Sequence, residues 1–360
     1  MTTTGDRLPR YRTGNADLDA KLVELLDAVG VTEDRDQLFE ILVSAVRLAT
    51  DHPGRLDLKI TNAALKEMRE AFRVFAPYRH VPKITMFGSA RTLPEDPLYA
   101  QARDLAAALA ESGWMVVTGA GPGIMAAGLE GAGRDNSFGI NIRLPFEQGA
   151  NEFIAGDPKL VEMKYFFTRK LMLVKESQGF VALPGGFGTL DEALELLTLA
   201  QTGKAEPVPI VLLEVPGGTY WQAFERFVDE EVAARGLISP EDRCLYCITD
   251  DVRAAADELL GFYRNYHSRR FVRGRLVLRL RARPTDDELA RLNEEFADIC
   301  SDGDIHATDA LPEEVADDDV VDLPRIVFRF DQLHHGRLRR LIDSLNRLSS
   351  APPAGSIPER

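Results

Sequence analysis

The chain has 360 residues, of which 45% are hydrophobic and 28% are charged, as is typical of a soluble globular protein with one large or two ordinary domains. Its net charge of −14 argues against a general binder of nucleic acid or of anionic membrane surfaces. It has no apolar run close to the roughly 20 residues of a membrane-spanning helix, and its first residues lack the apolar segment of a signal peptide. We therefore expect a cytoplasmic protein whose partners include neither nucleic acid nor a membrane.

The first part of the chain is predicted to be helical. Residues 1–14 have no apolar periodicity, and we expect them to form a flexible tail. From Ala16 to about Phe75, apolar residues recur with the period of a helix, with a break at Pro53 and Gly54. The pattern predicts a helical N-terminal extension over residues 1–78.

Residues 79–267 alternate between short apolar runs and amphipathic segments. The apolar runs, which predict strands, cover 83–88, 114–119, 137–142, 179–184 and 208–214. The amphipathic segments, which predict helices, cover 97–113, 121–132, 157–177, 189–203 and 220–236. Because strands that alternate with helices form a parallel sheet covered on both faces, we predict an α/β fold with a doubly wound, mostly parallel, Rossmann-like sheet. Ligands of such sheets bind at the carboxyl ends of the strands.

The pattern changes after about Tyr266 and predicts a small α+β appendage over residues 268–348. Alternating strands are expected at 273–284 and 325–330, and amphipathic helices at 285–300 and 336–348, the first with a capping box. We interpret the arginine-rich strand at 273–284 as a solvated face balanced by the acidic segment 311–322, with a binding surface as the alternative. The last residues, 349–360, are predicted to be a disordered tail.

The three cysteines fit a reducing compartment. Cys244 and Cys247 have the spacing found in zinc and redox sites, but a zinc site also needs a second pair or histidines at ligand spacing, and neither is evident. We interpret both as ordinary residues of a strand.

Three predicted strands end in glycine-rich turns that lead into a helix. The residues of these turns are Gly88 and Ser89; Gly119, Gly121 and Gly123; and Gly185, Gly186, Gly188 and Thr189. Backbone N–H groups at the start of a helix have no partner within the helix, and the helix dipole adds partial positive charge, so each turn is a candidate phosphate site. None matches the dinucleotide fingerprint or the P-loop. Together, the three turns could converge on one mononucleotide.

Arg169 and Lys170 lie within an otherwise apolar helical segment, and their pattern has two interpretations. They could be a basic pair whose charged ends reach solvent at an interface. Alternatively, they could bind a phosphate group or the edge of a purine. The segment 139–151 follows the third strand and could be a plain loop.

The stretch from Pro184 to Glu192, together with Arg169 and Lys170, resembles the Lonely Guy family of cytokinin riboside 5′-monophosphate phosphoribohydrolases, some of which carry the older label lysine decarboxylase. The family pattern Pro-Gly-Gly-x-Gly-Thr-x-x-Glu is met in full by Pro184, Gly185, Gly186, Gly188, Thr189 and Glu192. The likeness covers roughly residues 80–265, and the two ends lie outside the compact plant-type core. The chain therefore resembles a longer bacterial member.

The resemblance implies hydrolysis of the N-glycosidic bond of a nucleoside 5′-monophosphate to a free base and ribose 5-phosphate, with Arg169 and Glu192 as the catalytic pair. It implies a set of substrate-binding residues, namely Gly88, Ser89, Gly119, Gly121, Gly123, Met125, Lys170, Pro184, Gly185, Gly186, Gly188 and Thr189. It also implies that no metal or organic cofactor is needed, and that the chain assembles as a homodimer or a multiple of dimers. A decarboxylase that uses pyridoxal phosphate finds no support, because no lysine lies in a recognisable cofactor-binding context.

Other functions on the same fold stay open at this stage. The chain could bind a nucleotide or the molybdenum cofactor without catalysis, although the presence of both Arg169 and Glu192 weighs against this. It could also be a regulatory nucleotide sensor whose added ends serve as effector or assembly modules. AMP and a cytokinin-type N6-modified AMP are both candidate substrates.

Overall fold

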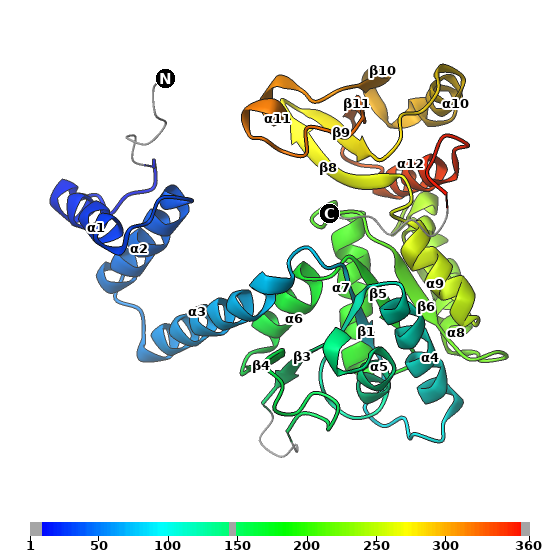
Figure 1. Ribbon diagram of the computed structural model, residues 1–360, viewed down its shortest axis with the longest axis horizontal. Helices are drawn as coiled ribbons and strands as arrows, with labels where there is room; N and C mark the ends of the chain where they lie inside the picture. Colours follow the sequence, from blue (N-terminus) through cyan, green and yellow to red (C-terminus); the bar gives the residue numbers. More distant parts are fainter. Residues whose placement is uncertain (1–8, 144–148, 354–360) are drawn as a thin grey trace. The chain divides into compact units, whose positions relative to one another are not determined.

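The computed structural model describes residues 9–143 and 149–353, and the chain divides into two compact units, Met1–Lys66 and Glu67–Arg360 (Figure 1). The first unit contains α1 (Ala16–Val29), α2 (Arg35–Thr50) and the beginning of α3 (Arg55–Phe75). Leu26, Phe39 and Val43 form its small core. The prediction of N-terminal helices is therefore confirmed.

The predicted N-terminal tail is only partly described. Residues 1–8 lie outside the described residues. Closer to α1, the hydroxyl of Thr13 donates to Asp19 at 2.7 Å, and the guanidinium of Arg47 donates to the carbonyl oxygen of Arg12 at 2.9 Å. The expectation of a flexible tail is thus wrong for this segment, because side chains of α1 and α2 hold it in place.

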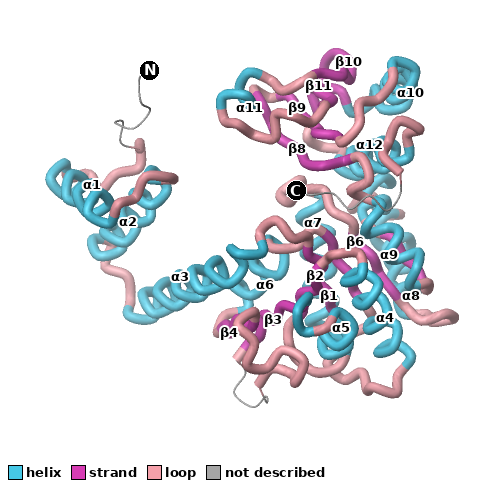
Figure 2. The backbone as a smooth tube through the Cα atoms, viewed as in Figure 1, coloured by secondary structure: helices cyan, strands magenta, loops and turns pink. Residues whose placement is uncertain are grey.

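A seven-stranded parallel sheet forms the centre of the second unit (Figure 2). Its strands are β1 (Lys83–Phe87), β2 (Met115–Thr118), β3 (Ser137–Ile142), β4 (Leu160–Met163), β5 (Gly179–Ala182), β6 (Ile210–Leu213) and β7 (Cys247–Thr249). They lie in the order β4-β3-β2-β1-β5-β6-β7, and every neighbouring pair is parallel. The predicted doubly wound, Rossmann-like α/β fold is confirmed.

Helices cover both faces of this sheet because its strands are apolar on both sides. Ile84 and Met86 of β1 face a cluster that includes residues of α4 (Pro97–Glu111), α5 (Ile124–Ala132) and α9 (Val252–Gly261). Phe87 of β1 faces the other cluster, to which the end of α3, α6 (Phe166–Lys175), α7 (Phe187–Gln201) and α8 (Tyr220–Phe227) contribute. A π-helix, Val228–Ala233, continues α8, and short 3-10 helices cover Ala76–Tyr78, Arg134–Asn136 and Pro240–Leu245.

Two predictions for this unit are wrong. The segment 157–177 is not one helix, because its first part forms the strand β4, which pairs with β3 at the edge of the sheet. Of the two cysteines, Cys247 lies in β7 as expected, but Cys244 lies in the 3-10 helix that precedes it. Ser239, followed by a proline, begins that helix with a capping box.

The C-terminal part forms a four-stranded antiparallel sheet with two longer helices (Figure 1). Its elements are β8 (Tyr266–Val272), β9 (Arg275–Leu280), α10 (Asp286–Phe296), a 3-10 helix (Ala297–Ile299), β10 (Cys300–Thr308), α11 (Pro312–Ala316), β11 (Arg325–Phe330) and α12 (His335–Arg347). The predicted capping box is present, with Thr285 and Glu288 bonded to each other's backbone. Leu276, Leu278 and Phe328 join the hydrophobic cluster that contains α4 and α9, so the α+β appendage packs directly on the core.

The arginine-rich strand is not a solvated face. Arg279 of β9 is only 4% exposed, and it donates to the buried carboxylate of Glu314 at 2.7 Å. Arg325 of β11 bonds the other oxygen of the same carboxylate at 2.8 Å. The acidic segment does balance the arginines as predicted. The prediction that these arginines are solvated is wrong, because the segment folds over the sheet and buries the ion pairs.

The predicted disordered tail is ordered where it is described. The hydroxyl of Ser349 donates to Glu288 at 2.8 Å, and Arg264 donates to the carbonyl oxygen of Pro352 at 2.6 Å. Residues 354–360 lie outside the described residues. Within residues 9–143 and 149–353, no helix is long and apolar enough to cross a membrane.

Candidate active site

The connections of the sheet reverse direction between β1 and β5. The chain leaves β1 towards β2 on one side of the sheet, and it returns to the other side of β1 as β5 before continuing to β6. At this point the N–H of Leu183 donates to the carbonyl oxygen of Phe87 at 2.9 Å, and the N–H of Ser89 donates to that of Pro184 at 3.3 Å. The first and third glycine turns therefore lie side by side at the position where parallel α/β sheets bind ligands.

A cavity of about 890 Å³ opens at these strand ends. Most of the predicted site residues line it: Gly88, Ser89, Gly119, Gly121, Met125, Arg169, Gly185, Gly186, Gly188, Thr189 and Glu192. Gly123, Lys170 and Pro184 are not among its lining residues. The three glycine turns and the Arg169 helix thus converge on one space that is large enough for a small organic ligand.

The glycines of the site have two different roles. A methyl group on Gly123, whose φ is +68°, would lie 2.2 Å from the carbonyl oxygen of Ser89, and one on Gly88 would lie 2.6 Å from the side chain of Ile124. These glycines let the first two turns pack against each other. Gly186 and Gly188 have no atom within 4 Å of such a methyl group, so both leave open space where backbone meets the cavity.

The start of α7 has the properties of an anion site. Its N-cap is Gly186, no side chain caps it, and its first turn carries no acidic residue. The first N–H groups of a helix have no acceptor within the helix, and the helix dipole makes this end partly positive. Since Gly186, Phe187 and Gly188 all line the cavity, this positive end faces the space where a ligand would bind.

The backbone of two strand ends holds Arg169 at the cavity. Its Nε donates to the carbonyl oxygen of Ile140 in β3 at 2.9 Å, and its guanidinium lies 3.5 Å from the carbonyl oxygen of Gly119 after β2. A methyl group on Gly119 would lie 2.0 Å from this guanidinium, so the second glycine turn makes room for the arginine. A guanidinium fixed in this way presents a positive charge to the cavity with little loss of conformational entropy on binding.

Glu192 lies one turn into α7 and is only 8% exposed, although the residue lines the cavity. Its Oε2 makes no hydrogen bond within the described residues. Burial raises the pKa of Glu192 to about 7, against the opposing positive charges of Lys170 and Arg169. This carboxyl group can therefore exchange a proton near neutral pH, as a general acid or base must.

Lys170 faces a group of carboxylates on α7. Its ammonium group lies 2.7 Å from Asp191, 2.7 Å from Glu195 and 3.8 Å from Oε2 of Glu192. These partners raise the pKa of Lys170 although burial opposes the shift, so it keeps its charge at neutral pH. Lys170 thus joins α6 to α7 and opposes the rise in the pKa of Glu192. Its role in binding substrate stays a prediction.

Part of the chain matches a known protein family and several curated proteins. Residues 121–259 match the family model described as possible lysine decarboxylase. The chain is 39% identical over 101 residues to a probable cytokinin riboside 5′-monophosphate phosphoribohydrolase of Oryza sativa subsp. japonica, covering 28% of this chain and 46% of that protein. It is 45% identical over 75 residues to a cytokinin riboside 5′-monophosphate phosphoribohydrolase of Arabidopsis thaliana, covering 21% and 33%.

Residues 121–259 are thus a lysine decarboxylase-like domain of the Lonely Guy family. The chain spans less than half the length of either curated relative. Among solved structures, it is similar to the molybdenum cofactor carrier protein of Chlamydomonas reinhardtii, with 23% identity and a TM-score of 0.34 over 50% of this chain and 98% of that one.

Several residues that line the cavity of this domain are not marked by any sequence motif described above. They are Met86, Phe87, Ala90, Arg91, Pro122, Asn141, Ile142, Phe166, Leu173, Phe187, Leu190, Asp191 and Tyr220. Six of the thirteen directly follow or precede a predicted residue, so their place beside a glycine turn or beside Glu192 was the available signal. Tyr220 is different, because it reaches the site from the helix after the neighbouring strand β6, and no local motif marks it.

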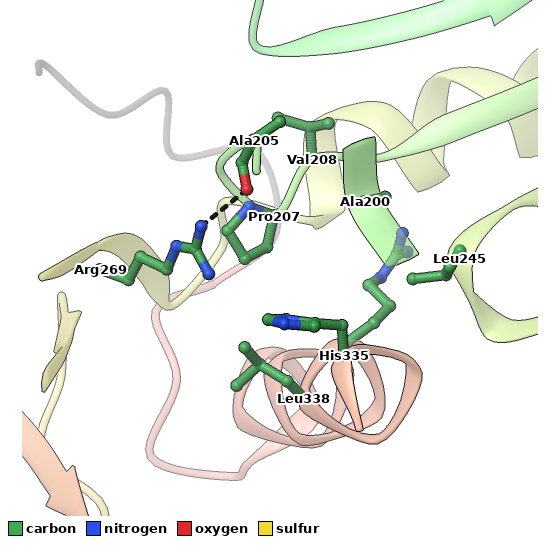
Figure 3. Close-up of a pocket in the computed structure, with 9 residues that line it drawn as sticks. Ala200, Ala205, Pro207, Val208, Leu245, Arg269, His335 and Leu338 are labelled. Atoms are coloured by element: carbon green, nitrogen blue, oxygen red, sulfur yellow. Dashed lines mark hydrogen bonds between the residues drawn. The ribbon is translucent and has the colours of Figure 1, made fainter. Parts of the chain in front are cut away.

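A second, much smaller cavity lies between the Lonely Guy domain and the C-terminal sheet (Figure 3). Its volume is about 20 Å³, enough for a water molecule or two but not for a nucleotide. Arg269 of β8 borders it and donates to the carbonyl oxygen of Ala205 at 2.7 Å, while His335 and Leu338 of α12 close another side (Figure 3). We assign this cavity to packing between the two parts.

Proposed function

We propose that the chain hydrolyses the N-glycosidic bond of a nucleoside 5′-monophosphate and releases the free base and ribose 5-phosphate. The observation that supports this most is Glu192, a buried carboxyl group with a pKa of about 7 that shares one cavity with Arg169 and the start of α7. The named curated relatives are phosphoribohydrolases, and the match to them carries the same proposal to this chain.

The 5′-phosphate is proposed to bind at the start of α7. Gly185, Gly186, Gly188 and Thr189 would surround it with backbone N–H groups and a hydroxyl group, and the helix dipole would favour its charge. The ribose would then lie over the first turn of α7, next to Glu192. Gly88, Ser89, Gly121 and Met125 would complete the walls of the binding site.

The chemistry breaks the bond between C1′ of the ribose and the nitrogen of the base. The bonding electrons leave with the base, which takes up a proton from solvent, and the sugar gains positive charge in an oxocarbenium-like transition state. The carboxylate of Glu192 stabilises this charge and accepts a proton from the water whose oxygen attacks C1′. Arg169 would orient the nucleotide and stabilise the negative charge that develops on the departing base.

The proposed substrates are AMP and a cytokinin-type N6-modified AMP, as the resemblance implies. A carrier of nucleotide or molybdenum cofactor without catalysis is the alternative. The buried carboxyl group of Glu192, with its pKa raised to about 7, favours the hydrolase over this alternative.

We also propose that the chain forms a homodimer, which the resemblance implies. Large apolar side chains are exposed on α6 and α7, namely Phe166, Phe167, Leu171 and Leu194. Lys170 links these two helices through Asp191 and Glu195, so the exposed side chains belong to one surface. A second copy of the chain is the occupant that this surface fits, because clustered apolar side chains are characteristic of permanent interfaces.

The test is to incubate the protein separately with AMP, CMP, GMP and isopentenyl-AMP and to measure ribose 5-phosphate and free base. The proposal expects stoichiometric release of both products from at least one of these nucleotides. Binding of a nucleotide without release of base would instead support the carrier alternative.

A further inference from the structure

Tyr220 is the first residue of α8, and it lies beyond the carboxyl end of β6, the strand next to β5. Its hydroxyl group donates to the carbonyl oxygen of Gly185 at 2.7 Å, and its side chain lines the large cavity. Burial raises the pKa of Tyr220, so the phenol remains a protonated donor at neutral pH. The third glycine turn is thus bonded to a helix that contributes nothing to the family motif.

Glu214 holds Tyr220 in this position. The two oxygens of its carboxylate accept the N–H groups of Tyr220 at 2.8 Å and Trp221 at 3.0 Å, so Glu214 caps the start of α8. The ring of Tyr220 packs edge-to-face on that of Trp221, with 4.8 Å between their centres. The phenol is therefore fixed by the end of β6 and is not free to follow the glycine turn.

This hydrogen bond determines how the peptide between Gly185 and Gly186 is oriented. The peptide bonds of the described residues are all trans, and in a trans peptide the N–H points opposite to the C=O. Because the carbonyl of Gly185 points towards α8, the N–H of Gly186 points away from α8. Within residues 9–143 and 149–353, no hydrogen bond occupies this N–H, and Gly186 lines the cavity.

A peptide between two glycines is unusually free to rotate, because neither residue has a Cβ that restricts its backbone angles. Rotation by half a turn would place the carbonyl oxygen of Gly185 where the N–H of Gly186 now lies. That oxygen would face a bound phosphate and repel it. The orientation of this one peptide therefore determines whether an N–H group or a carbonyl oxygen faces an anion at this point of the turn.

We propose that Tyr220 is a positioning residue that holds the Gly185–Gly186 peptide with its N–H directed towards the 5′-phosphate of the substrate. The inference rests on the proposed function for the identity of the ligand. It assigns the phosphate affinity of the third glycine turn to a side chain about 35 residues further along the chain.

The experiment compares Tyr220→Phe with Tyr263→Phe in the full chain. The control is matched, because the hydroxyl of Tyr263 also donates to a backbone carbonyl oxygen, that of Gln178, at 2.7 Å. Gln178 directly precedes β5, so this hydrogen bond lies at the amino end of the strand, away from the cavity at its carboxyl end. Affinity for ribose 5-phosphate and for adenine is measured by calorimetry, and kcat and KM are measured with AMP. Thermal melting of both variants confirms that they are folded.

We expect Tyr220→Phe to bind ribose 5-phosphate roughly tenfold to a hundredfold more weakly and to raise KM for AMP in parallel, with kcat at saturation and adenine affinity within about threefold of wild type. Tyr263→Phe should leave all of these values within about threefold. A merely structural role for Tyr220 would instead lower kcat and adenine affinity as well.

Different results would overturn the role of Tyr220 and the proposed function. If the wild type binds ribose 5-phosphate but hydrolyses no nucleotide, the proposed function is wrong, and the affinities of the two variants still decide the inference. Equal affinity of wild type and Tyr220→Phe for ribose 5-phosphate would overturn the inference, whether or not AMP is hydrolysed. A wild type that does not bind ribose 5-phosphate at all would also overturn it.

Discussion

At the scale of single residues, Glu192 shows which of two opposing effects is larger. Lys170 and Arg169 both favour its ionised form, whereas burial favours its protonated form, and burial is the larger effect because the pKa rises from 4.5 to about 7. An exposed glutamate beside the same two cations would have a lowered pKa. The burial of Glu192, one turn into α7, therefore gives this residue a proton affinity suited to catalysis at neutral pH.

We expect Glu192→Gln to reduce kcat for AMP more than about a hundredfold while nucleotide affinity stays within about tenfold, because the charge of Glu192 is needed mainly in the transition state. The measurement is kcat together with calorimetric affinity on one preparation. A variant that keeps more than about a tenth of the wild-type kcat would exclude a catalytic role for Glu192.

The same substitution should change how stability depends on pH. Between pH 4.5 and about 7, the unfolded chain has released the proton of Glu192 that the folded protein still holds, so the free energy of unfolding falls as pH rises through this range. The loss is on the order of 3 kcal/mol and is complete above about pH 7. Glutamine cannot ionise and avoids the loss.

We compare the melting temperature of Glu192→Gln with that of wild type at about pH 5 and at about pH 8. The difference, variant minus wild type, should be larger at pH 8. Thermal melting of both proteins at the two pH values measures this. A difference in melting temperature that is the same at both values would mean that burial does not perturb Glu192.

The sequence predicted which residues meet at the site better than it predicted their properties. Arg169 and Glu192 line one cavity, as the family motif implied. The raised pKa of Glu192 could not be predicted, because it depends on how deeply α7 is packed. Tyr220 was missed for a related reason, since it reaches Gly185 through the pairing of β5 with β6 and not through any local pattern.

Among the secondary-structure elements, the position of each glycine in its turn determines whether it serves packing or binding. Gly188→Ala should leave the melting temperature nearly unchanged, because the new methyl group meets no atom within 4 Å and alanine favours a helix. Because Gly188 lines the cavity at the start of α7, we expect the methyl group to take up space that the phosphate needs, so affinity for ribose 5-phosphate should fall at least about tenfold. Calorimetry and thermal melting on the same sample measure both effects.

Gly123→Ala is the contrasting variant. Its methyl group would lie 2.2 Å from the carbonyl oxygen of Ser89, at a residue whose φ is +68°. We therefore expect a loss of stability of about 2 kcal/mol or more. If Gly188→Ala destabilised the protein as strongly as Gly123→Ala, the division of the glycines into binding and packing roles would be wrong.

Most elements of the core were predictable because buried strands and amphipathic helices have different apolar periods. The strand β4 was not, since its four residues continue the apolar pattern of the helix α6 with only two residues between them. Its pairing with β3 is a tertiary interaction that local sequence does not reveal. Arg279 misled the prediction in a similar way, because its buried partner Glu314 lies 35 residues further along the chain.

At the scale of the whole molecule, we expect the chain to sediment as a homodimer. Replacing Phe167 and Leu171 together by glutamate should yield monomers, because two charges would be buried against the apolar surface of a second copy. Sedimentation velocity measures the outcome. As a control, replacing Leu56 and Leu58 by glutamate should leave the mass of the sedimenting species unchanged, because both leucines are exposed on the first unit. A wild type that sediments as a monomer would contradict the proposed homodimer.

In the proposed function, one cavity both recognises the 5′-phosphate of a nucleotide and breaks its glycosidic bond. The most direct test is the ratio of kcat/KM for AMP to that for adenosine under identical conditions. Loss of two or three charge-assisted hydrogen bonds, each worth about 1.5–3 kcal/mol, predicts a ratio on the order of a thousand or more. Turnover of adenosine within about tenfold of that of AMP would contradict the proposed function, because the glycine turns would then not form the phosphate site.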